Sequence, residues 1–180
     1  MPNLDYVDEY STREELLDSL CQPVRDWFRE RFPDFTDPQK MAIPQIMKGH
    51  HLLLCSPTGS GKTLTAFLTI IDDLVRRSLD GSLENGVSCI YISPIKALAN
   101  DIQKNLIGPL TEIREAFLPK RAKEIRVGLR TGDTSQKDRD KILRNPPHIL
   151  ITTPESLALG LASKRFRPIL SGLKWMIVDE

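Results

Sequence analysis

The stretch "CSPTGSGKT", residues 55–63, governs how the rest of the sequence is interpreted. It lies between an apolar run and a long helical stripe. Gly59 and Gly61 allow the backbone to curl so that consecutive N–H groups point inward at an anion. Lys62 adds a cation that can reach the β- and γ-phosphates of a nucleotide, and the hydroxyl of Thr63 can join a Mg²⁺ shell. We therefore predict a phosphate-binding loop.

The loop departs from the pattern G-x-x-x-x-G-K-[ST] at its first position, where Ser56 replaces glycine. A small residue satisfies the tight turn, so the assignment stands. The alternative is a Gly/Ser turn that happens to precede a lysine, but the strand-like run before it and the helical stripe after it favour a nucleotide site. The predicted cofactor-binding residues of the loop are Ser56, Thr58, Gly59, Ser60, Gly61, Lys62 and Thr63.

Apolar runs of strand length recur along the chain, separated by segments of helical periodicity. The runs are 51–55, 88–92, 125–130, 148–152 and 174–178. They are continuously apolar rather than alternating, which indicates burial on both faces. We therefore predict a three-layer α/β fold, a parallel sheet with helices on both faces.

Two amphipathic helices are expected before this region. The first opens with a capping box formed by Thr12 and Glu15, and the second has Pro23 in its first turn. We assign residues 1–34 to an N-terminal helical flank and residues 35–180 to the main domain.

Two of the strand ends are followed directly by a Ser or Thr cap and a proline, at Ser93-Pro94 and Thr153-Pro154. This pattern predicts a helix N-terminus immediately after a strand. Free backbone N–H groups and the positive end of a helix dipole are then presented at the carboxyl edge of the sheet, where open α/β sheets bind ligands.

The last apolar run ends in two carboxylates, Asp179 and Glu180. An acidic pair in this position is often only a solvated tail. Beside a phosphate loop, however, Asp179 is expected to hold Mg²⁺, usually through water, while Glu180 orients and deprotonates the attacking water. We predict Lys62, Asp179 and Glu180 as catalytic residues and Thr63 and Asp179 as the Mg²⁺ site.

The composition is that of an ordinary soluble domain, with 40 % hydrophobic and 27 % charged residues and a net charge of +1. No apolar stretch has the length of a membrane span, and no signal peptide is evident, so a cytoplasmic protein without a membrane partner is expected. Cys21, Cys55 and Cys89 lack metal-type spacing and are expected to be small core residues. Basic clusters at 119–123 and 163–168 fit either a solvated surface or a phosphate-binding face.

A series of motifs in order across residues 35–180 resembles the superfamily 2 helicases. They are "FTDPQKMAIP" (Q motif), "SPTGSGKT" (motif I), "SPIKALAND" (motif Ia), "RTGDTS" (TGD element), "TTPESL" (motif Ib) and "IVDE" (the start of motif II). Only the phosphate loop is decisive alone, but the set in this order is specific. The motifs look most like the large helicase-related (Lhr) group of DExH-box helicases, with Ski2-like and Hel308-type helicases as nearby alternatives.

The resemblance implies the first RecA-like domain of an ATP-dependent helicase that tracks along a single strand. ATP and Mg²⁺ would be its cofactors, with Gln39 at the adenine edge. Its partners would be single-stranded or partly duplex DNA, with RNA as the alternative, and a second RecA-like domain of the same longer chain. Lhr-type enzymes are associated with DNA repair. The nucleic-acid contacts implied by motifs Ia, TGD and Ib are Pro94, Lys96, Thr131, Gly132, Thr153, Pro154 and Ser156.

Two other functions remain open from the sequence. A P-loop kinase of a small metabolite would be nearly complete at this length, but it needs an arginine-bearing lid, and no such segment is evident. The other is a nucleotide- or nucleic-acid-binding module without turnover.

By the resemblance, the strand that follows motif II lies between the motif II strand and the phosphate-loop strand. A chain that stops after the motif II strand, at Glu180, should therefore show no direct pairing between 51–55 and 174–178, which would stand about 9–10 Å apart. These 180 residues are also expected to bind Mg-ATP weakly and to hydrolyse it negligibly.

Overall fold

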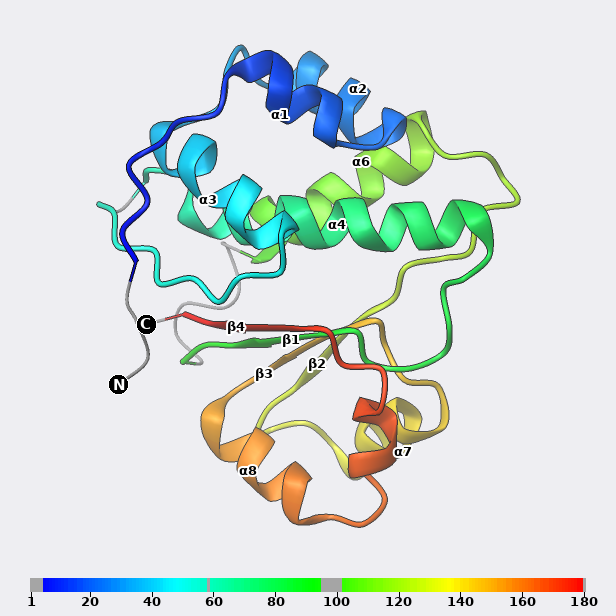
Figure 1. Cartoon of the computed structure of the whole chain (residues 1–180). Coiled ribbons are helices and arrows are strands. Elements are labelled where there is room, and N and C mark those ends of the chain that lie inside the picture. The colour runs from blue at the N-terminus through cyan, green and yellow to red at the C-terminus, as the bar shows by residue number, and fades with distance from the viewer. Residues whose placement is uncertain (1–4, 58, 95–101, 180) are drawn as a thin grey trace.

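The computed structural model of the chain describes residues 5–57, 59–94 and 102–179 (Figure 1). Three predicted site residues, Thr58, Lys96 and Glu180, lie outside the described residues. The elements are α1 (Arg13–Ser19), α2 (Gln22–Arg31), α3 (Asp37–Met47), α4 (Lys62–Asp80), β1 (Cys89–Ile92), the π-helical turn η2 (Gln103–Ile107), α6 (Gly108–Ala116), β2 (Val127–Arg130), α7 (Gln136–Arg144), β3 (Ile149–Thr152), α8 (Pro154–Ala162), the 3₁₀ turn η3 (Arg167–Leu170) and β4 (Trp175–Val178).

Four of the five predicted strands form one parallel sheet in the order β2-β3-β1-β4. In register, Cys89 of β1 lies opposite Ile149 of β3 on one side and Trp175 of β4 on the other. The two central strands are buried along their whole length, as expected. The edge strands are not, since Met176 and Val178 of β4 are mostly exposed. The prediction of burial on both faces is therefore wrong for β2 and β4.

Helices cover both faces of the sheet, which confirms the layered α/β architecture (Figure 1). Helices α3, α4 and α6 lie over one face, and α1 and α2 lie outside them (Figure 1). On this side Cys89 and Tyr91 pack into the core that also contains Phe67 of α4. Helices α7 and α8 lie over the opposite face, where Ile90 and Leu150 pack with other apolar side chains.

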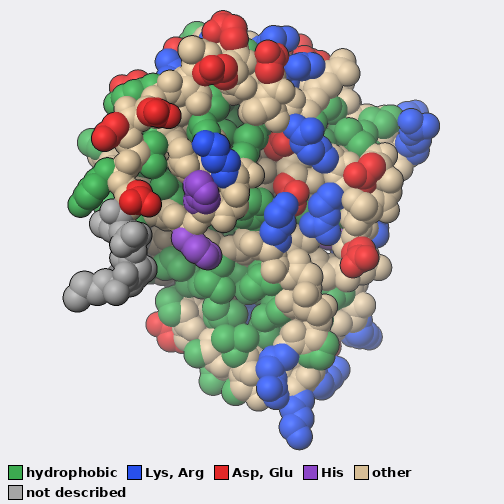
Figure 2. Space-filling view, in the orientation of Figure 1, with side chains coloured by type: hydrophobic (Ala, Val, Ile, Leu, Met, Phe, Trp, Pro, Cys, Tyr) green, Lys and Arg blue, Asp and Glu red, His purple; other side chains and the backbone are tan. Residues whose placement is uncertain are grey.

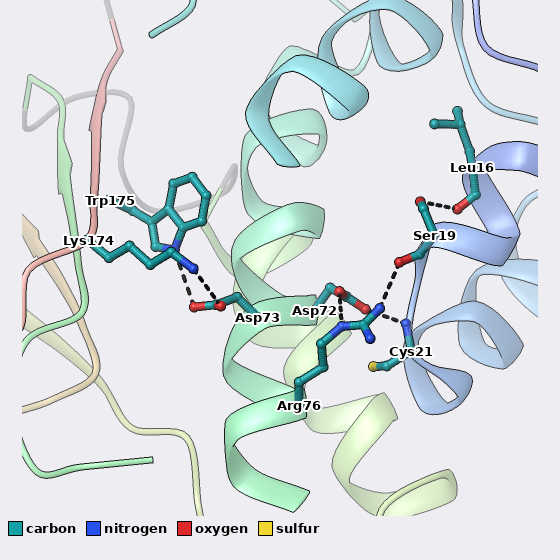
Figure 3. Close-up of polar contacts among 8 residues, drawn as sticks. All are labelled: Leu16, Ser19, Cys21, Asp72, Asp73, Arg76, Lys174 and Trp175. Carbon is teal, nitrogen blue, oxygen red and sulfur yellow. Dashed lines mark hydrogen bonds and ion pairs between the residues drawn. The ribbon is translucent and has the colours of Figure 1, made fainter. Parts of the chain in front are cut away.

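The N-terminal helices join the core through α4. The predicted capping box is present, with the Thr12 amide donating to Glu15 Oε2 at 2.8 Å. The buried carboxylate of Asp72 accepts the backbone N–H of Cys21 at 2.6 Å and Nε of Arg76 at 2.7 Å (Figure 3). Adjacent to it, Asp73 faces the sheet and accepts hydrogen bonds from the residues that open β4 (Figure 3). Helix α4 is therefore tied to the flank on one side and to β4 on the other.

The fifth predicted strand, 51–55, does not form. Leu52 is 37 % exposed and Leu53 80 % exposed. A strand is stable only beside a hydrogen-bonded neighbour, and no described strand pairs with this segment, so its apolar side chains stay on the surface. The strand predicted at 51–55 is therefore wrong, and the expected gap between it and β4 stays a prediction.

The three cysteines differ in burial, depending on whether their segment packs into the core. Burial, with Asp72 beside it, raises the pKa of Cys21 to about 12, and burial also raises the pKa of Cys89. Cys89 is a buried core residue, as predicted, and Cys21 is partly buried against the same core. Cys55 is exposed, which corrects its prediction as a core residue, because its segment lies outside the sheet. None of the helices in the described parts of the chain is long and apolar enough to cross a membrane.

Candidate nucleotide and nucleic-acid site

The predicted phosphate loop ends in a left-handed glycine that caps α4. Gly59 and Gly61 have φ values of 79° and 88°, a region that residues with a Cβ rarely occupy. Helix α4 begins directly after Gly61, so its free N-terminal N–H groups face the loop. The loop thus has the backbone form expected of an anion site, although the strand predicted before it is absent.

The side chain of Lys62 lies across this loop. Its ammonium donates to the carbonyl oxygens of Ser56 and of Pro57, the latter at 3.0 Å. The hydroxyl of Ser56 donates to that of Ser60. The ammonium is therefore held on the inner side of the loop by carbonyl dipoles, and a phosphate there would compete with those carbonyls for it.

The Q-motif segment packs against the same loop. Gln39 lies in the first turn of α3 and is only 3 % exposed, and its Oε1 accepts the backbone N–H of Thr36 at 2.9 Å. A Cβ on Gly61 would stand 2.9 Å from Gln39 Nε2 and 3.3 Å from Thr36 Oγ1. Gly61 is therefore required both for its φ and for this close approach, and Gln39 is positioned beside the phosphate loop.

Asp179 extends the β4 ladder, with its N–H donating to the carbonyl of Ile92 at 2.9 Å. Its Oδ2 accepts a hydrogen bond from the hydroxyl of Tyr91. Because side chains alternate along a strand, Asp179 shares with Ile177 the sheet face covered by α4. The ring of Tyr91 lies there too, 5.0 Å from that of Phe67. Asp179 thus projects from the sheet on the side where α4 carries Lys62 and Thr63.

This donor set suits a hard divalent cation. A carboxylate and a hydroxyl are oxygen donors of the kind that Mg²⁺ prefers, and Mg²⁺ commonly needs only one or two protein ligands beside phosphates and water. Thr63 lies in the first turn of α4 and is half-buried. The residues present therefore fit the metal that the phosphate loop implies.

The predicted nucleic-acid contacts differ in exposure. Pro94, Gly132 and Pro154 are exposed at the strand ends. Thr131, Thr153 and Ser156 are 9 %, 2 % and 5 % exposed. Thr153 caps α8 as expected, and its Oγ1 accepts the N–H of Ser156 at 3.3 Å. The threonine and serine side chains thus build the corners, and of the predicted contacts that the structure describes the exposed ones are glycine and proline.

The TGD corner is organised by an arginine that the motif-based prediction missed. Arg139 of α7 donates from Nη2 to the carbonyl of Gly132 at 2.9 Å and from Nε to that of Thr134 at 2.9 Å. The Thr131 N–H donates to Thr134 Oγ1 at 2.7 Å. The available signal was a basic residue one turn into the helix after the motif.

The hydrogen bond from Tyr91 to Asp179 was also missed, and the signal for it was the polar member of the buried run "CIYI".

The motif Ib helix is anchored by a second arginine. The guanidinium of Arg130, at the end of β2, lies 4.4 Å above the ring of Phe166. A Cβ on Gly160 of α8 would collide with Arg130 Nη1, so this glycine makes room for the stacked pair. The end of β2 is thus linked through side chains to α8 and to Phe166, which follows it.

Basic and apolar side chains are unevenly distributed over the face seen in Figure 2. Two histidine side chains lie above a green apolar area, while lysines and arginines gather at its right and lower margins (Figure 2). Among the described residues, the apolar side chains of Leu53, Met176 and Val178 are exposed.

Residues 36–180 match the DEAD/DEAH box helicase family. Among proteins of similar sequence is the "ATP-dependent helicase Lhr-Core" of Methanocaldococcus jannaschii, 46 % identical over 182 residues that cover 100 % of this chain and 22 % of that protein. The "Lhr helicase/uracil glycosylase" of Escherichia coli is 44 % identical over 92 % of this chain and 11 % of its own length. The chain thus spans about a fifth or less of the length of these relatives.

A solved structure of Mycobacterium smegmatis helicase Lhr bound to ssDNA and AMP-PNP superposes with a TM-score of 0.79. It is 42 % identical, and the match covers 91 % of this chain and 20 % of that one. The DEAD-box helicase Mss116, at 22 % identity and a TM-score of 0.75, shares the fold. The RecA-like fold and the likeness to Lhr-type helicases expected from the motifs are confirmed, and the chain belongs to the DEAD/DEAH box helicase family.

Proposed function

We propose that residues 35–180 are the ATP-binding motor domain of a nucleic-acid helicase or translocase, with residues 1–34 as its helical flank. The observation that carries this proposal is the packing of Gln39 and Thr36 against Gly61, directly before Lys62. An adenine-recognising amide beside a phosphate loop suits ATP. The name of the Methanocaldococcus jannaschii relative, an ATP-dependent helicase, supports the same assignment.

In this proposal each residue of the loop has one task. Lys62 exchanges the carbonyls of Ser56 and Pro57 for phosphate oxygens, a stronger partner for an ammonium. Backbone N–H groups of residues 59–63 bind the phosphates at the positive end of α4. Gln39 hydrogen-bonds the adenine through its amide.

Thr63 and Asp179 would hold Mg²⁺, which neutralises charge on the transferred phosphoryl group when bound. Asp179 supplies its carboxylate from the end of β4, and Glu180 orients the attacking water and accepts its proton. This division leaves one carboxylate to bind the metal and one to act as a base. The likeness to Lhr-type helicases supports a DExH-type motif II.

The second substrate is a single strand of nucleic acid, DNA in preference to RNA, gripped by its sugar-phosphate backbone. The exposed surfaces of Pro94, Gly132 and Pro154, together with Lys96, would make the contacts. The buried caps Thr131, Thr153 and Ser156 would shape them. Such contacts read no bases, as translocation requires, and the ssDNA in the Lhr structure supports this choice of substrate.

We further propose a second RecA-like domain of the same longer protein as partner, a cytoplasmic location and a role in DNA repair. An arginine from that partner domain would stabilise the transition state, an effect worth about 10³–10⁵ in rate in related hydrolases. Without it, residues 1–180 bind Mg-ATP with a dissociation constant of about 0.1–1 mM and hydrolyse it negligibly.

The test is a calorimetric titration of the chain with ATP and with GTP in Mg²⁺, repeated with a mixed-sequence single strand of DNA. ATP binding that is stronger than GTP binding, together with salt-dependent DNA binding, is the expected result. Equal binding of GTP would contradict the adenine role of Gln39. Phosphoryl transfer to a small acceptor, without any effect of DNA, would instead assign the chain to the metabolite kinases.

A further inference from the structure

We propose that Tyr91 is a positioning residue for the metal-binding carboxylate of Asp179, an inference that rests on the proposed function. Its hydroxyl donates to Asp179 Oδ2. The parallel ladder places Tyr91 opposite Ile177, so Asp179, two residues further along β4, lies on the same face. The contact is therefore built into the register of β1 and β4.

The ring that carries this hydroxyl is held on all sides. Tyr91 is only 2 % exposed and lies in the central strand β1. Its ring centroid is 5.0 Å from that of Phe67, tilted by 36°. Phe67 lies on α4 five residues after Lys62, about 7.5 Å along the helix axis. Tyr91 thus connects the phosphate-loop helix to the end of the motif II strand.

The chemistry of the contact suits orientation of the Asp179 carboxylate rather than neutralisation of its charge. A tyrosine hydroxyl is an uncharged donor at neutral pH, so it can fix one carboxylate oxygen without cancelling the negative charge that a cation needs. The donated bond occupies one lone-pair site of Oδ2, which leaves Oδ1 and the remaining sites for a cation or its water. Outer partners of this kind commonly change metal affinity about 10–100-fold when they are removed.

If Tyr91 served only for packing, its ring would be needed and its hydroxyl would not. Tyr91→Phe separates the two, because it keeps the ring beside Phe67 and deletes only the donor. Tyr10 provides a matched control, since it is 57 % exposed and lies outside the β1–β4 ladder that carries Asp179. Tyr10→Phe is expected to leave the unfolding midpoint unchanged, and Tyr91→Phe is expected to lower it by no more than about 2–4 °C, as for the loss of about one hydrogen bond.

The experiment measures the affinity of the 180-residue chain for a fluorescent ATP analogue, once in Mg²⁺ and once in EDTA. The quantity of interest is the gain in affinity that Mg²⁺ provides. We expect Tyr91→Phe to reduce this gain about tenfold and to leave the metal-free affinity unchanged, whereas Tyr10→Phe changes neither. An unchanged gain, or an equal loss with and without metal, overturns the inference.

A double-mutant cycle identifies the residue through which Tyr91 acts. In an Asp179→Asn background, Tyr91→Phe should have no further effect on the Mg²⁺ gain, because the group that it positions is already altered. Additive losses would contradict the inference. If Lys62→Ala binds the nucleotide as tightly as the unaltered chain does, the proposed site itself is contradicted. The two failures are therefore distinguishable.

Discussion

Two regions with the same sequence logic behave differently in this molecule. At β3, a buried strand is followed directly by a capped helix, with Thr152 in register between Ile92 and Arg130. At 51–55 another apolar run leads toward the phosphate loop, but Leu52 and Leu53 are exposed and no described strand pairs with it. The glycine conformations of the loop are nevertheless in place, held by α3 and by the start of α4. A strand is stabilised by pairing with strands that are far away in the sequence, whereas the conformation of the loop is held by helices that are close to it in the sequence.

The largest effect expected from this difference is at Lys62. Lys62→Ala should weaken ATP binding at least 100-fold, since a charge-assisted contact to phosphate is lost from a loop that already has its shape. The free energy of unfolding should change by less than about 0.5 kcal/mol, because no core group is removed. Titration calorimetry and urea unfolding measure the two quantities. Lys48→Ala, at an exposed lysine, is the control and should leave ATP affinity unchanged.

If α4 holds the loop, the anchors of α4 should matter for stability more than for binding. Asp72→Ala leaves the N–H of Cys21 without its acceptor and removes one partner of Arg76, which still donates to the carbonyl of Ser19 (Figure 3), and we expect it to cost about 2 kcal/mol. Asp73→Ala loses more exposed contacts to Lys174 and Trp175 and should cost about 1 kcal/mol. Urea unfolding gives both values. Equal losses of stability for the two variants would mean that the contact of α4 with the N-terminal flank stabilises the fold no more than its contact with β4.

The amino-terminal edge of the sheet, opposite the corners, can be probed through the buried His148, which directly precedes β3. Burial, and then the charges of Arg126, Lys123 and Arg77, lower the pKa of His148 from 6.5 to about 4. Between these values the unfolded chain binds a proton that the folded chain does not, so stability is present above pH 6.5 and is lost as pH falls toward 4. The loss attributable to His148 at pH 5 should be about 2 kcal/mol.

Urea unfolding at pH 7 and pH 5 tests this, with His148→Gln as the variant. Glutamine keeps an acceptor for the N–H of Arg126 but does not titrate. The variant should lose about 2 kcal/mol less than the unaltered chain between the two pH values. His51→Gln, at an exposed histidine, should not alter the pH dependence. Identical slopes for His148→Gln and the unaltered chain would exclude a buried neutral imidazole.

The smallest expected effect is at the contact between α3 and the loop. Gln39→Glu keeps an oxygen that can accept the Thr36 N–H and so preserves the cap, but it replaces the amide donor. The preference for ATP over GTP should fall about tenfold, by analogy with amide readout of adenine in nucleic acids. Stability should stay within about 0.5 kcal/mol. Competition titrations with both nucleotides measure the preference, and an unchanged ratio would remove Gln39 from adenine recognition.

What the sequence could predict follows the same division between near and distant contacts. Gly59, Gly61 and Lys62 are local signals, and their geometry agrees with the pattern. The bond from Tyr91 to Asp179 spans 88 residues and depends on the pairing of β1 with β4, so the run "CIYI" marks the tyrosine but no local pattern identifies its partner.

The edge strands illustrate the same point. Met176 and Val178 look like core residues in the sequence, and they are exposed because β4 ends the described sheet. Strand order is a long-range property, and hydrophobic runs alone do not encode it. The same reason explains why 51–55 was predicted as a strand and is not one.

Hydrogen exchange of the chain with Mg-ATP and with single-stranded DNA tests the central claim most directly. ATP should slow exchange at residues 36–40 and 59–65, where the Q-motif turn meets the phosphate loop. DNA should slow exchange at 131–134 and 153–157, the corners after β2 and β3. Protection by ATP confined to the corners, or protection by DNA confined to the acidic N-terminal twenty residues, would contradict the account.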